Sequence, residues 1–142
     1  MNRPAWEEYA LLIAETAAVR SQDPWRKVGA CLLRHDRSVL SVGYNGPPPS
    51  VEIDWTSRET RRDYVTHAEV NALRWARPGE IWLLASTSLP CQRCMLEAAA
   101  YGVEKIVYRD ELDASVYDTP AILDLAEAAG IVVTKGLDAG QP

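Results

Sequence analysis

The strongest constraint on the fold of this chain is a set of metal-binding side chains that stand apart in the sequence. His67 is followed two residues later by Glu69, and Cys91 and Cys94 come after a further helix-and-strand interval. One imidazole and two thiolates are good zinc ligands, and three protein ligands leave one tetrahedral position for water, as in catalytic zinc sites. The fold is therefore expected to bring His67 and the cysteine pair together.

Both ligand segments are predicted to begin helices. The helical pattern of 68–77 stops at Pro78-Gly79, and that of 91–101 is closed by Gly102. The partial positive charge of a helix N-terminus favours the thiolate form of both cysteines. Two helix starts that face each other over one sheet edge would unite the three ligands.

The remaining pattern alternates between short strands and helices. Helices are expected over 6–20 and 120–129, and strands over 28–33, 38–42, 80–86, 105–108 and 131–134. A long loop reaches from Gly43 to about Val65. The order α-β-β-α-β-α-β-α-β predicts an α/β fold with a mixed five-stranded sheet sandwiched between helices. We expect one domain over 1–135 and a flexible tail over 136–142.

Composition narrows the class of protein. The net charge of −5 disfavours nucleic acid as a partner, because phosphate neutralisation supplies most of that affinity. No apolar run is long enough to span a bilayer, and the N-terminus has no evident secretory signal, so we expect a cytoplasmic protein. Three cysteines suit a reducing compartment, and Cys31 is expected to be a buried core residue.

Glu69 is not needed as a ligand and is free to carry protons. His-x-Glu followed by Pro-Cys-x-x-Cys is the motif of the zinc-dependent nucleobase deaminases, in which such a glutamate is the general acid and base. The alternatives are a structural zinc knuckle and a redox-active cysteine pair. A structural site usually has a fourth protein ligand, and no further cysteine lies nearby. We expect one zinc ion, because only His35 remains for a second site, and a turn position exposes it.

Beyond the metal motif, several blocks resemble one family. They are Val28-Gly29-Ala30-Cys31, Gly43-Tyr44-Asn45-Gly46, 67–73, 90–94 and Ile106-Val107-Tyr108. In this order they are similar to the deoxycytidylate (dCMP) deaminases over roughly residues 8 to 135. The resemblance implies the cytidine deaminase fold, one catalytic zinc, and conversion of dCMP to dUMP with release of ammonia. It also implies a homo-oligomer, commonly a hexamer, with a dimer as the smaller alternative.

The resemblance also assigns roles to residues. It implies that His67, Cys91 and Cys94 are the zinc ligands and that Glu69 is the proton shuttle. Asn45 matches the family asparagine that holds the sugar, although Asn-Gly is also a strong turn dipeptide.

Two further residues of the matching blocks belong to the expected substrate site. Tyr108 matches a family tyrosine near the site, and Ala68 lies between the histidine ligand and the proton shuttle.

A monophosphate needs cationic donors, and they flank the motif on two sides: Arg26 and Lys27 before the first strand, and Arg58, Arg61 and Arg62 before His67. We place Arg26 in the expected substrate site. For the later arginines the alternative is a solvated charged loop, because Glu59 and Asp63 are interspersed among them.

Other readings stay open. The extra ligands of a second zinc site, which several family members carry, are absent, and regulation by dCTP or dTTP is in doubt.

The substrate alternatives are another cytosine nucleotide or nucleoside, guanine, and a tRNA or DNA base. A different class of protein is a non-catalytic zinc domain that binds nucleotides. Trp75 and Trp82 are predicted core or subunit contacts, and Trp25 and Trp55 are predicted to line the pocket or an interface.

Overall fold

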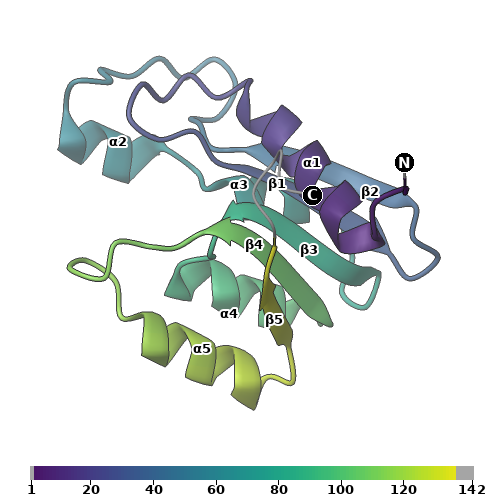
Figure 1. The fold of residues 1–142 in the computed structure, drawn as a ribbon. Coiled ribbons are helices and arrows are strands. Elements are labelled where there is room, and N and C mark those ends of the chain that lie inside the picture. Colours follow the sequence, from purple (N-terminus) through teal and green to yellow (C-terminus); the bar gives the residue numbers. More distant parts are fainter. Residues whose placement is uncertain (1, 137–142) are drawn as a thin grey trace.

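The computed structural model describes residues 2–136, which form a five-stranded sheet with helices on both faces (Figure 1). The strands are β1 (Gly29–Arg34), β2 (Val39–Tyr44), β3 (Ile81–Ser88), β4 (Lys105–Asp110) and β5 (Val132–Lys135). The helices are α1 (Trp6–Ala18), α2 (Arg58–Tyr64), α3 (Ala68–Leu73), α4 (Gln92–Ala100) and α5 (Thr119–Ala128). The predicted α/β class is confirmed.

The sheet has the order β2-β1-β3-β4-β5 and is mixed, as predicted. β1 runs antiparallel to β2 and β3, whereas β3, β4 and β5 run parallel to one another. The start of β1 therefore lies at the same sheet edge as the ends of β3 and β4. A hydrogen bond from Gly29 N to Thr87 Oγ1 (3.2 Å) links the two strands at this edge.

Alternate residues of each strand bury their side chains in separate cores. Cys31, Leu33 and Val107 pack with α1 on one face, and Leu32 and Ile106 pack with α3, α4 and α5 on the other. These strands are nearly continuously apolar, as expected for a sheet covered on both faces. Cys31 is fully buried, which confirms its predicted core position.

Two glycines let helices approach the sheet closely. A Cβ on Gly29 would lie 1.9 Å from Ala14 O of α1, and a Cβ on Gly43 would lie 2.5 Å from Ala68 O of α3. Gly43 thus fixes the depth at which α3 packs on β2.

The predicted element order lacks α2, which lies within the segment expected to be a loop. All seven residues of α2 are at least partly exposed, so the helix carries no apolar stripe for periodicity to detect. Its start is marked instead by Ser57, whose side chain accepts a hydrogen bond from Thr60 N at 3.2 Å. Figure 1 shows α2 set apart from α4 and α5.

Several predicted boundaries also differ. α3 ends at Leu73 rather than Arg77, because Trp75 N and Ala76 N bond three residues back and tighten the chain into turns. β3 extends two residues further than predicted, to Ser88, and β4 extends to Asp110.

The tryptophans divide between surface and core. Trp75 is 73% exposed, so the core position is wrong for it and the alternative, a subunit contact, stays a prediction; Trp82 packs partly buried beneath α1. Within residues 2–136, none of the helices has the length and apolar character needed to cross a membrane. Of the predicted flexible tail, 137–142 lies outside the described residues.

Candidate active site

His67, Cys91 and Cys94 form a compact cluster of potential metal ligands. Nδ1 of His67 lies 3.3 Å from Sγ of Cys94 and 3.5 Å from Sγ of Cys91, and the donor atoms are all within 4.8 Å of one another. Zn–N and Zn–S bonds of ordinary length at a tetrahedral angle separate nitrogen from sulfur by about 3.6 Å. The side chains therefore fit one tetrahedral zinc ion, with Nδ1 as the imidazole donor.

The local backbone explains how these side chains come together. His67 is the N-cap residue of α3 and Cys91 that of α4, both in extended conformations that begin their helices as the sequence predicts. Within the described residues, neither side chain caps its own helix, so both are free to face the cluster. Cys94 follows in the first turn of α4 and is 1% exposed.

The pKa values of the two cysteines are shifted in opposite directions. Hydrogen bonds from the Cys94 thiol and, with a smaller effect, from His67 lower the pKa of Cys91 to about 4. The same contact and burial raise the pKa of Cys94. A thiolate beside an imidazole is ready for a divalent cation, which displaces the remaining proton.

Glu69 lies in the first turn of α3, buried next to the cluster. It is 4% exposed, and desolvation raises the pKa of its carboxyl group. Glu69 lines the same cavity as His67 and Cys91 and is not one of the three clustered ligands. A buried carboxyl group with a raised pKa is suited to proton transfer.

The cluster opens into a cavity of about 630 Å³. The walls come from the segment before β1, the end of β2, α2 with the residues up to Glu69, the β3–α4 connection, and the loop after β4. A volume of this order accommodates a small organic ligand.

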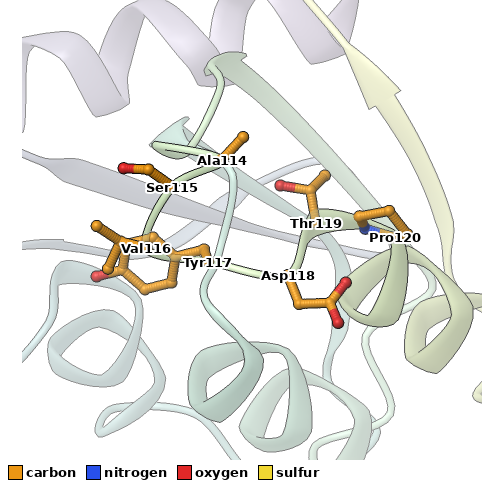
Figure 2. Close-up of a pocket in the computed structure, with 7 residues that line it drawn as sticks. All are labelled: Ala114, Ser115, Val116, Tyr117, Asp118, Thr119 and Pro120. Atoms are coloured by element: carbon orange, nitrogen blue, oxygen red, sulfur yellow. The ribbon is translucent and has the colours of Figure 1, made fainter.

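A second, open hollow of about 360 Å³ is lined by Ala114–Pro120 (Figure 2). Val116 and Tyr117 belong to the linings of both the hollow and the cavity. This loop between β4 and α5 therefore forms one wall of the cavity.

The predicted substrate residues are not all brought to the cavity. Arg26, Asn45 and Ala68 line it, together with Glu69. Tyr108 lies outside this lining and donates a hydrogen bond from its hydroxyl group to Glu111 Oε1 at 2.9 Å. The structure therefore gives Tyr108 a polar partner of its own, and substrate contact by this residue stays a prediction.

Asn45 joins β2 to the segment before β1. Its Oδ1 accepts from Val28 N at 2.8 Å, and its Nδ2 donates to Arg26 O at 2.9 Å and towards Asp23 Oδ2 at 3.4 Å. A side-chain amide has two donor hydrogens and two acceptor lone pairs, so one lone pair of Oδ1 is left over. Asn45 is thus both a structural tie and a potential acceptor.

Arg26 and Ser88 face the cavity as a bonded pair. Nη2 of Arg26 donates to Oγ of Ser88 at 2.5 Å, and the backbone N–H of Arg26 bonds to Asp23 Oδ1 at 3.1 Å. Asp23 is 8% exposed and also accepts from Trp25 N. The segment carrying Arg26 is thereby fixed from both sides.

Sequence reasoning missed four polar residues of the cavity lining: Asp23, Ser88, Asp113 and Tyr117. Asp23 stands before Pro24, a turn signal that explains its backbone contacts. For Ser88 the detectable signal is its position at the end of a strand beside the cysteine motif. The loop after β4 carries no motif, and only the fold brings it to the site.

Arginines outnumber acidic residues in the cavity lining. Arg26, Arg58, Arg61 and Arg62 line the cavity, against the acidic residues Asp23, Glu69 and Asp113. The missed helix α2 thus supplies most of the positive charge and suits an anionic ligand.

Comparisons with known proteins agree with this geometry. Residues 4–110 match the family described as the cytidine and deoxycytidylate deaminase zinc-binding region. The chain is 38% identical over 130 residues to the deoxycytidylate deaminase of Mycobacterium phage D29, covering 78% of this chain and 99% of that protein. It is 27% identical over 140 residues to the mouse deoxycytidylate deaminase, covering 92% and 79% respectively.

A similar solved structure is the dCMP deaminase of cyanophage S-TIM5 in complex with dCMP and dUMP. It superposes with a TM-score of 0.78 at 27% identity, covering 96% of this chain and all (100%) of that one. The chain therefore belongs to the zinc-dependent cytidine and deoxycytidylate deaminase family.

Proposed function

We propose that this protein hydrolytically deaminates dCMP to dUMP and releases ammonia. The observation that carries the proposal is a buried carboxyl group, Glu69, that lines the same arginine-rich cavity as the metal-ligand residues His67 and Cys91. The phage and mouse deoxycytidylate deaminases support the choice of substrate, as does the cyanophage enzyme in complex with dCMP and dUMP.

The metal ligands in this proposal are His67, Cys91 and Cys94. A zinc ion held there would leave one position for water and would lower the pKa of that water to about 7. Glu69 accepts a proton from the attacking water, a transfer that its raised pKa favours. Because its carboxyl group is sheltered from solvent, the proton stays available for the ring.

Glu69 then delivers this proton to N3 of the cytosine, while the water oxygen bonds to C4. A second proton, from the oxygen now on C4, passes through Glu69 to the exocyclic amine. The C4–N bond breaks, ammonia leaves, and the C4–O bond becomes the carbonyl of uracil. Protons balance, because both protons of the water end on the ring and the leaving group, and Glu69 is regenerated.

The sugar and the phosphate have candidate partners along the cavity. The remaining lone pair of Asn45 Oδ1 is suited to accept from a sugar hydroxyl group. Arg26 adds positive charge beside Ser88. We include Ala68 in this site because it lines the cavity between the histidine ligand and Glu69.

We also propose that the enzyme is a cytoplasmic homo-oligomer. The outer face of α1 supports self-association, since Trp6 (49% exposed) and Leu12 (48% exposed) lie on it in the isolated chain. Trp6 packs edge-on against Tyr9, which is also exposed, with ring centroids 5.8 Å apart. The cytoplasmic location is supported by the free cysteines, which suit a reducing compartment. Sedimentation of zinc-loaded protein, with and without dCTP or dTTP, tests both assembly and effector binding.

A panel of substrates tests the proposed reaction. Zinc-loaded protein is incubated with dCMP, CMP, deoxycytidine, guanine and a single-stranded oligonucleotide, and ammonia release is followed. We expect the highest kcat/KM for dCMP. A higher kcat/KM for another compound would contradict dCMP as the preferred substrate. Nucleotide binding without turnover of any compound would favour a non-catalytic zinc domain.

A further inference from the structure

We propose that Arg61 binds the substrate phosphate and that the indole of Trp25 holds its guanidinium in place. The inference rests on the proposed function, because it assigns a partner to the 5′-phosphate of the nucleotide. It makes α2, a helix without an apolar face, an element for recognition.

Arg61 is partly buried but lacks the partners that such a cation normally has. Its Nε is shielded from solvent, and among residues 2–136 no group accepts a hydrogen bond from it. The ion pairs found in the same range do not include Arg61. An unpaired donor costs free energy when it is removed from water.

Arg109 shows how this chain satisfies another partly buried guanidinium. Nη1 of Arg109 lies 2.8 Å from Glu15 Oε1, and its Nη2 lies 3.0 Å from Asp110 Oδ2. Because Arg61 differs from Arg109 in facing a cavity, a ligand is the natural source of the missing negative charge.

Trp25 gives Arg61 a defined direction. The guanidinium carbon of Arg61 lies 5.4 Å from the centroid of the Trp25 ring, within the range of cation–π attraction. A cation–π contact uses none of the guanidinium N–H groups as hydrogen-bond donors to an oxygen, so they are free for an anion. The side chain is therefore oriented before the ligand arrives.

The aromatic support is itself anchored at two points. The backbone N–H of Trp25 bonds to Asp23 Oδ1 at 2.8 Å, and its indole Nε1 donates to Trp55 O at 3.3 Å. The backbone of Arg61 is held in the first turn of α2, where its N–H donates to Ser57 O at 3.1 Å. Neither Trp25 nor Trp55 belongs to the described cavity lining, so of their two predicted roles only the interface stays open, and Trp25 contacts Arg61 instead.

Arg61 is a stronger candidate than the other arginines of the cavity. Arg26 is already bonded to Ser88, Arg62 pairs with Asp63 at 3.6 Å while largely exposed, and Arg58 is exposed as well. A planar fork suits a phosphate bidentately, and one such charge-assisted contact changes affinity about 10- to 100-fold.

The test compares Arg61→Gln with wild type on dCMP and on deoxycytidine, which lacks the phosphate. We expect kcat/KM for dCMP to fall about 10- to 100-fold through KM, and that for deoxycytidine to stay within about twofold. Arg61→Lys should recover only part of the loss, because it keeps the charge without the fork. Trp25→Ala should raise KM for dCMP in the same selective way.

Arg77→Gln is the matched control, because Arg77 is exposed and lies outside the cavity lining. It should leave both substrates unchanged. Equal losses on dCMP and deoxycytidine in Arg61→Gln, or no loss on dCMP, would overturn the assignment.

A binding measurement separates this inference from the proposed reaction. Calorimetric titration of the zinc-loaded protein with dUMP and with deoxyuridine should show that Arg61→Gln weakens only dUMP. This result without any turnover of dCMP would refute the proposed reaction and still support phosphate binding by Arg61. Turnover of dCMP with unchanged dUMP affinity in the variant would refute Arg61 alone.

Discussion

The side-chain oxygen of Asn45 accepts a hydrogen bond from the backbone N–H of Val28 at 2.8 Å. This bond ties the end of β2 to the entry of β1 at the mouth of the cavity. The resemblance to the deaminases suggests Asn45 as a sugar contact, and the bond shows that the same amide also supports the segment that carries Arg26.

Replacement of Asn45 should therefore affect stability and substrate binding together. Asn45→Ala leaves Val28 N and Arg26 O without their partner, and we expect the free energy of unfolding to fall by about 1–3 kcal/mol. KM for dCMP should rise as well. Ser41→Ala is the control, because it removes a side-chain bond to Ala72 O outside the cavity. Urea unfolding and steady-state kinetics check both, and an unchanged KM in Asn45→Ala would argue against substrate contact.

Glu69 should be needed for proton transfer but not for metal binding. Glu69→Gln keeps the shape of the side chain and removes its basicity, so we expect kcat to fall by about 10²–10⁴-fold with zinc content unchanged. Glu8→Gln, on the exposed surface of α1, should retain full activity. The measurement is turnover of dCMP alongside elemental analysis of the same preparation. A fully active, zinc-replete Glu69→Gln protein would remove Glu69 from the mechanism.

Close packing at Gly43 should couple the sheet to the site. A Cβ there would lie 2.5 Å from Ala68 O and 2.6 Å from Ala72 N, so α3 must shift, together with its first-turn residue Glu69. We expect Gly43→Ala to lower the free energy of unfolding by about 1–3 kcal/mol or more and to weaken zinc binding.

The neighbouring loop offers a matched control for this change. A Cβ on Gly46 would meet nothing within 4 Å, so Gly46→Ala should be close to neutral. Thermal unfolding and zinc titration of both variants make the comparison. Equal effects of the two substitutions would show that the contact with α3 is unimportant.

The sequence was sufficient for the parts of the fold that carry strong local signals. Hydrophobic continuity predicted the five strands, and helical periodicity with breaks at Pro78-Gly79 and Gly102 predicted the two helices that follow His67 and Cys91. These features depend on near neighbours in the chain, which a single sequence records directly.

The parts that escaped prediction depend on contacts distant in the sequence. α2 lacks a buried face, so its only local mark is the capping Ser57. Asp113 and Tyr117 reach the cavity through the course of the loop after β4, which no motif marks. The resemblance to the deaminases also suggested Tyr108 for the site; its hydroxyl group bonds to Glu111 and the residue lies outside the cavity lining, so its contact with substrate stays a prediction.

Cys31 should make stability depend on pH in the alkaline range. Burial raises the pKa of its thiol from 9.0 to about 12, so the unfolded chain releases this proton at a lower pH than the folded protein does. Stability contributed by Cys31 is therefore complete below about pH 9 and falls by about 1.4 kcal/mol per pH unit between about 9 and 12.

Urea unfolding of the reduced, zinc-loaded protein measures this effect at about pH 8.5 and about pH 10.5, which lie on either side of the pH at which the loss of stability begins. Cys31→Ala removes the contribution of this thiol, whereas all other ionisable groups are common to the variant and wild type. The variant should lose less stability than wild type over this interval. Identical losses in the two proteins would mean that the Cys31 thiol ionises as readily in the folded state.

The proposed reaction requires that dCMP be converted stoichiometrically at the site formed by His67, Cys91, Cys94 and Glu69. The most direct measurement is the product balance of zinc-loaded protein with dCMP, with ammonia assayed and the nucleotide identified by mass. We predict one ammonia and one dUMP for each dCMP consumed, and loss of both products after zinc is removed by a chelator. Recovery of dCMP unchanged from fully zinc-loaded, folded protein would contradict the account.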